Sequence, residues 1–171
     1  MNLKKIFALL LVATMLFATG CDLFVSDKDF TKDGLTITLT NRFKEDPEQA
    51  ATLECNACYT SSSMAVVTIE VPFAMLGVSA GEISLDEYCE LFREGLVTEG
   101  TLKDVSELTH ENGLTYLTCI STEDPEIDTM CFMVFYETDD AFWVVELDCN
   151  ESTYEKLKDT MIKYAKSVRF E

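Results

Sequence analysis

The feature that most constrains the fold is a run of four strand-like segments joined in pairs by tight turns. Residues 102–109 and 114–121 flank a turn containing Asn112 and Gly113, and Asn-Gly is the strongest short signal for a β-hairpin. Residues 131–137 and 142–148 flank a second turn, TDDA. Consecutive strands joined by short turns pair antiparallel, so this order predicts an antiparallel sheet.

Three more strands are predicted before this run. Residues 34–39, GLTITL, alternate apolar and polar side chains with a period of two. Residues 52–60 and 64–71 form a predicted hairpin around three serines, and Pro72 ends its second strand because proline cannot donate to a sheet. The polar segment 41–51 is predicted as a loop or helical turn.

Two helices are marked by capping boxes, in which a serine caps the helix and a glutamate follows three residues later. The first box is Ser84–Glu87 and the second is Ser152–Glu155. Each precedes apolar residues at helical spacing, which predicts one buried face per helix. For the first helix these residues are Leu85, Tyr88, Cys89, Phe92 and Leu96, and for the second they are Tyr154, Leu157, Met161, Tyr164, Ala165 and Val168.

This order of elements, closed by the segment SVRF at the end of the second helix, resembles the PsbP-like fold. The most similar segments are GLTITL, FWVVEL and SVRF, and the resemblance covers residues 34–171. It implies an α+β protein, an α/β/α sandwich with a central, mainly antiparallel sheet and two main helices. The family includes photosystem subunits, a Ran-binding protein and bacterial lipoproteins, so the resemblance implies a binding or scaffolding domain and not an enzyme.

The N-terminus predicts export. Lys4 and Lys5 precede about 13 apolar residues, 6–18, which fall short of the roughly 20 residues that span a bilayer. This arrangement is typical of a secretory signal peptide. An uncleaved membrane helix is the alternative.

Ala18-Thr19-Gly20-Cys21 resembles a bacterial lipobox, although leucine is commoner where Ala18 stands. The resemblance implies that Cys21 is lipidated and becomes the first residue of the mature chain. We therefore expect a signal peptide over 1–20, a lipidated cysteine and polar tether over 21–33, and one globular domain over 34–171. Two acyl chains anchor a protein stably, which predicts a lipid-anchored protein on the extracytoplasmic face of the bacterial cell membrane.

The remaining cysteines are even in number, which favours disulfides in an exported chain. A local bridge between Cys55 and Cys58 is one candidate. A second joins Cys119 to Cys131, which lie at neighbouring strand ends. Burial of free thiols as small apolar side chains is the alternative. The six residues are Cys55, Cys58, Cys89, Cys119, Cys131 and Cys149.

Composition narrows the function. Acidic residues number 31 against 13 basic ones, for a net charge of −18, which argues against a nucleic-acid partner. The single histidine, His110, lies at a predicted turn, and no nucleophile-elbow or phosphate-loop motif occurs. A Cys₄ zinc site would need a second closely spaced cysteine pair, which the sequence lacks. We therefore expect no catalytic set, no cofactor and no metal.

The sequence thus predicts a membrane-anchored lipoprotein that binds a protein partner or ligand. An apolar connection containing Phe73, Met75, Leu76 and Val78 is the candidate partner patch. One alternative is a thiol-redox protein using Cys55 and Cys58, although no βαβ unit surrounds that pair. Another is an accessory subunit of a membrane complex.

Overall fold

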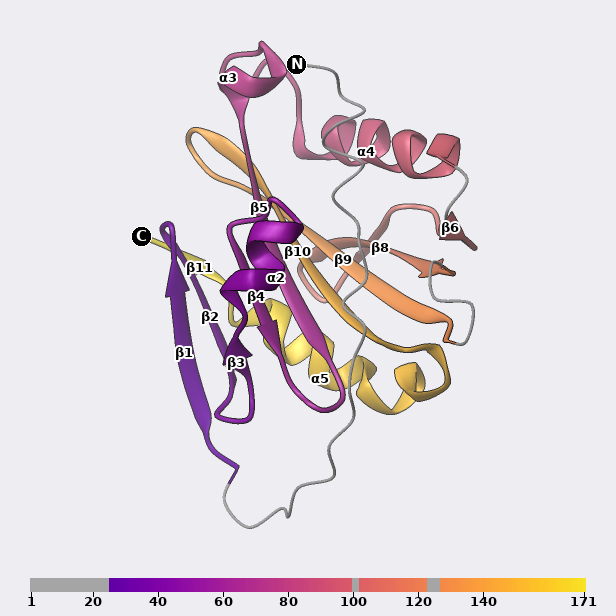
Figure 1. Cartoon of the computed structure of the whole chain (residues 1–171). Helices are drawn as coiled ribbons and strands as arrows, with labels where there is room; N and C mark the ends of the chain where they lie inside the picture. Colours follow the sequence, from indigo (N-terminus) through magenta and orange to yellow (C-terminus); the bar gives the residue numbers. More distant parts are fainter. Residues whose placement is uncertain (1–24, 100–101, 123–126) are drawn as a thin grey trace.

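A computed structural model describes residues 25–99, 102–122 and 127–171. An eight-stranded antiparallel sheet forms the centre of the molecule (Figure 1). Seven strands follow one another in the order β3-β4-β5-β10-β9-β8-β6, and β7 pairs with the first residues of β8, which β6 does not reach. The strands are β3 (Lys44–Glu45), β4 (Ala57–Thr60), β5 (Ala65–Pro72), β6 (Leu102–Lys103), β7 (Thr109–Glu111), β8 (Leu114–Ser121), β9 (Thr129–Glu137) and β10 (Ala141–Asn150).

The predicted hairpins are confirmed, but the strand predicted over 52–60 is shorter in the structure and spans only Ala57–Thr60. Asn112 and Gly113 have φ angles of 58° and 75°, the left-handed conformation that tight hairpin turns require. The single strand predicted over 102–109 is wrong, because the chain forms only the short β6 and β7 there. Asp104 has a φ of 50°, and the Ser106 hydroxyl accepts a hydrogen bond from the Thr118 backbone N–H at 2.9 Å. The regular strand pairing with β8 is therefore interrupted between the two short strands, although the Ser106 backbone N–H still donates to the Thr118 carbonyl oxygen at 2.8 Å.

A second, three-stranded sheet has the order β1-β2-β11. Its strands are β1 (Asp27–Lys32), β2 (Leu35–Thr40) and β11 (Arg169–Phe170). The predicted tether over 21–33 is wrong from residue 27 onward, since these residues pair with β2 along the whole of β1. Phe30 explains the pairing, because its ring packs against Tyr59 with centroids 5.0 Å apart.

In the described residues four α-helices accompany the sheets: α2 (Pro47–Thr52), α3 (Phe73–Leu76), α4 (Leu85–Glu99) and α5 (Tyr154–Lys166). The capping box of α4 is confirmed, because the Ser84 backbone N–H donates to Glu87 Oε2 at 2.8 Å and the Glu87 N–H donates to Ser84 Oγ at 3.3 Å. The prediction of a capping box at Ser152–Glu155, before α5, is wrong. A 3₁₀ turn, η1 (Glu151–Thr153), comes first, and its Ser152 N–H donates to the Asn150 side chain at 3.0 Å.

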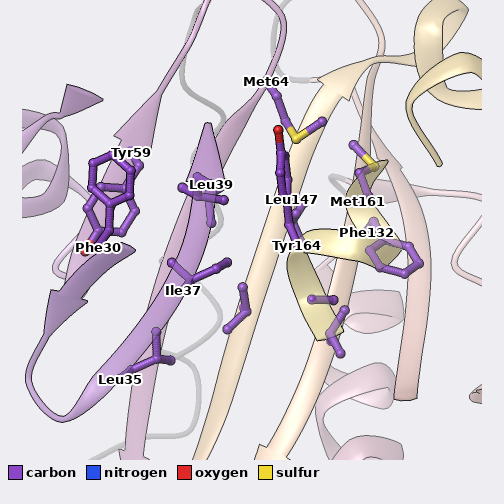
Figure 2. Close-up of a cluster of buried hydrophobic side chains, with 14 of the residues drawn as sticks. Phe30, Leu35, Ile37, Leu39, Tyr59, Met64, Phe132, Leu147, Met161 and Tyr164 are labelled. Atoms are coloured by element: carbon purple, nitrogen blue, oxygen red, sulfur yellow. The ribbon is translucent and has the colours of Figure 1, made fainter. Parts of the chain in front are cut away.

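The large sheet separates two hydrophobic clusters. Helix α5 and the small sheet cover one side, which we call the α5 face, and Figure 2 shows its buried residues, including Ile37, Phe132, Leu147 and Met161. Helices α2 and α4 cover the other side, the α4 face. The predicted fold class is confirmed, since the domain is an α+β sandwich around a mainly antiparallel sheet.

Candidate functional site

Cys21 and the predicted signal peptide over 1–20 lie outside the described residues. Lipidation of Cys21 therefore stays a prediction. Within residues 25–99, 102–122 and 127–171, no helix is long and apolar enough to cross a membrane.

Cys55 lies between α2 and β4, and Cys58 is the second residue of β4. Both are free thiols in this structure, and burial raises the pKa of Cys55 to about 11 and that of Cys58 to about 12. A redox cysteine needs a lowered pKa, because the thiolate is the attacking species. The raised pKa values of Cys55 and Cys58 give no support to the thiol-redox alternative.

Cys119 of β8 and Cys131 of β9 are directly opposite one another in the antiparallel register. The prediction that these two cysteines are neighbours is thus confirmed, and both are free thiols in this structure. A bridge between them stays a prediction.

The four residues of the predicted partner patch have different surroundings. Phe73 is a core residue, because it is buried and its ring contacts that of Phe142 at a centroid distance of 4.9 Å. Leu76 and Val78 are half-buried against the same cluster. Met75 is the exposed member. A continuous apolar patch is therefore not available at this connection.

A hollow of about 590 Å³ lies where the β1–β2 turn, the C-terminal residues and the β9–β10 turn meet. We call it the acidic hollow, because six of its lining residues carry carboxyl groups and none is basic. Trp143 and Phe170 add aromatic rings, which contact one another at 5.6 Å between centroids. The acidic members are Asp33, Glu70, Glu137, Asp139, Asp140 and Glu171.

The electrostatics of the acidic hollow reflect this crowding. Partial burial raises the pKa of Glu70, and the nearby charges of Asp140 and Asp33 raise it further. A cation entering the hollow would relieve this repulsion, and aromatic rings attract cationic groups. The hollow is therefore suited chemically to a lysine or arginine side chain.

A second cluster is buried on the α4 face. Asp148 of β10 pairs with Cys131 of β9, and Glu146 lies two residues earlier on the same side of β10. The ligand-type atoms of Cys131, Glu146 and Asp148 all lie within 4.8 Å of one another, and the three residues are only 1%, 4% and 3% exposed. Cys119 lies on the far side of Cys131.

Removal from water shapes the chemistry of this cluster. A hydrogen bond with Cys119 and burial raise the pKa of Cys131, while burial raises the pKa values of Glu146 and Asp148. The sequence predicted no metal site, yet here a thiol and two carboxyls converge. Their positions in separate strands leave no motif, and the only available signal was two acids in an otherwise apolar strand, FWVVELDC.

The sequence matches no protein-family model. It also matches no curated protein.

The solved structures that this one resembles include the following two. One is cyanobacterial PsbP (CyanoP) from Synechocystis sp. PCC 6803, with 12% identity, a TM-score of 0.52, and coverage of 91% of this chain and 99% of that one. The other is the Ran-binding protein Mog1p of Saccharomyces cerevisiae, with 9% identity, a TM-score of 0.55, and coverage of 86% and 96%. At these identities the likeness concerns the fold alone. The described domain has the PsbP-like fold.

Proposed function

We propose that this protein is a lipid-anchored binding protein on the extracytoplasmic face of a bacterial membrane, without enzymatic activity. The acidic hollow is its binding site, and the partner is a membrane-associated protein that inserts a basic side chain there. The observation that carries the proposal is the hollow itself, with six acidic residues and two aromatic ones around about 590 Å³.

Three further points support this proposal. The lipobox-like segment ending at Cys21 supplies an anchor, and two acyl chains hold a protein stably at a membrane. The net charge of −18 favours encounter with a basic partner over an acidic one. The fold neighbour Mog1p is described as a Ran-binding protein, which gives a precedent for protein binding by this fold.

The anchor and the hollow are tested separately. We expect Cys21→Ser to release or mislocalise the protein and to leave its precursor uncleaved, as seen by fractionation and by the mass of the chain. Normal processing and unchanged membrane retention in this variant would contradict the anchor.

The hollow is tested by crosslinking in intact cells. Asp139 and Glu94 are both exposed acids, but Asp139 lines the hollow and Glu94 lies on α4. We expect Asp139→Lys to lose most of the crosslinked partner and Glu94→Lys, with the same charge change, to keep it. The proposal fails if both variants retain the partner equally, or if the wild-type protein crosslinks to nothing above background.

The same crosslinks distinguish a subunit role. Recovery of several components of one membrane assembly, all lost together in Asp139→Lys, would identify the protein as an accessory subunit of that assembly. A single recovered protein would identify a pairwise complex.

A further inference from the structure

The buried cluster on the α4 face contains polar atoms without the partners that buried atoms normally have. Asp148 Oδ1 is buried, and it has no hydrogen-bond partner among the described residues. Ser121 Oγ, also buried, is unpartnered within the same ranges. Ser121 follows Cys119 by two residues on β8, so its side chain points to the same side of the sheet.

Among the described residues, no cationic side chain forms an ion pair with either carboxyl group. Arg93 pairs with Glu90 and Glu107, Lys163 pairs with Asp27, and Arg169 pairs with Asp29. No described lysine or arginine forms an ion pair with Glu146 or Asp148. A buried carboxylate without a counter-charge is strongly destabilising. Either protons or a bound cation must therefore neutralise the pair.

The ligand types select the cation. Ca²⁺ and Mg²⁺ take oxygen ligands alone, and Cu⁺ prefers sulfur ligands. Zn²⁺ accepts both thiolate and carboxylate ligands, usually four of them in a structural site. Cys131, Glu146 and Asp148 supply three. Cys119, directly across the β8–β9 pairing from Cys131, offers a second thiol as the fourth ligand.

We propose that Cys131, Glu146 and Asp148, with Cys119, form a buried structural Zn²⁺ site that joins β8, β9 and β10. The four residues come from three adjacent strands, so a metal would crosslink the middle of the large sheet. Their burial excludes solvent and substrate, which is the character of a structural site and not of a catalytic one. Burial also means that Zn²⁺ enters as the sheet forms.

The test uses the full chain in detergent, refolded under reducing conditions with or without added Zn²⁺, and elemental analysis of the washed protein. The wild-type chain should retain about one Zn²⁺ per molecule and unfold at a higher temperature with the metal than without it. Asp148→Asn and Cys131→Ser should each weaken Zn²⁺ binding by about tenfold or more.

Cys149→Ser is the matched control. Cys149 is a buried thiol like Cys131, and it lies in β10 next to Asp148 in the sequence. Its side chain, however, belongs to the cluster on the α5 face. This variant should keep the metal. Loading with Co²⁺ provides a direct readout, because thiolate ligation gives a charge-transfer absorption that should keep its intensity in Cys149→Ser and be clearly weaker in Cys131→Ser, which retains only the Cys119 thiol.

Misfolding of the variants is checked by thermal unfolding without metal. Asp148→Asn removes a buried ionisable group and keeps its shape, so the metal-free variant should be no less stable than the metal-free wild type. The proposal is overturned if the reduced wild-type chain retains no Zn²⁺ and gains no stability from it. It is also overturned if Asp148→Asn and Cys131→Ser bind Zn²⁺ as tightly as Cys149→Ser does.

Discussion

Successive side chains of β10 point to opposite faces of the large sheet, and the two sets of side chains differ in polarity. Toward the α5 face the strand presents only apolar or weakly polar side chains, namely Trp143, Val145, Leu147 and Cys149. Toward the α4 face it presents Phe142 and Val144 followed by two acids, Glu146 and Asp148. Both sets are almost completely buried.

This difference separates two roles within one sheet. Burial of aliphatic and aromatic side chains stabilises the fold in proportion to the area removed from water. Burial of a carboxyl does the opposite unless a partner compensates for it. The α5 face therefore supplies stability, whereas one end of the α4 face is built for a bound group.

The largest expected effect is on the α5 face. Leu147 is fully buried there, so Leu147→Ala should lower the free energy of unfolding by about 3 kcal/mol, from lost burial and the cavity left behind. Denaturant unfolding of the metal-free chain measures this change. A loss of less than about 1 kcal/mol would mean that this face is loosely packed and that the comparison of the two faces is wrong.

The sequence was sufficient for the parts of the fold that depend on local signals. The Asn112–Gly113 turn and the Ser84–Glu87 box each have a short-range physical cause, and both are present. The pairing of β1 was missed, because Phe30 is its only buried residue and a single apolar side chain gives no periodicity. Asp27 and Asp29 instead form ion pairs with Lys163 and Arg169, which are remote in sequence.

The site residues show the same limit. The proximity of Cys119 and Cys131 followed from the predicted strand order. The position of Glu146 and Asp148 did not, because alternating acids in a strand normally indicate a solvent-exposed face. Here helices cover both faces of the sheet, so the alternating acids are buried. The acidic hollow also escaped prediction, since the turns and the C-terminal residues that form it meet only in the folded chain.

One tyrosine hydroxyl on each face, that of Tyr136 and that of Tyr88, allows a comparison of smaller effects on stability. On the α5 face, Tyr136 donates a hydrogen bond to the Ala165 carbonyl oxygen at 2.8 Å. Tyr136→Phe should lower the free energy of unfolding by about 1 kcal/mol, the usual net value of one hydrogen bond. The loss stays modest because the Val168 N–H also donates to that oxygen, at 3.1 Å. An unchanged free energy of unfolding would mean that water replaces the lost bond.

The smallest effect is expected for the corresponding hydroxyl on the α4 face, and it should have the opposite sign. The Tyr88 ring stacks on Phe142 with centroids 4.3 Å apart, while its buried hydroxyl has no hydrogen-bond partner in the described part of the chain. Tyr88→Phe keeps the stacking and removes an unpaired polar atom. We therefore expect the free energy of unfolding to rise by about 0.5 kcal/mol.

Denaturant unfolding of Tyr88→Phe beside Tyr136→Phe checks both signs under one set of conditions. A destabilisation of Tyr88→Phe as large as that of Tyr136→Phe would show that the Tyr88 hydroxyl has a partner after all, most simply a buried water molecule. The α4 face would then be as well satisfied at Tyr88 as the α5 face is at Tyr136. The unpartnered polar atoms of that face would be confined to the neighbourhood of Ser121 and Asp148, where the proposed metal site lies.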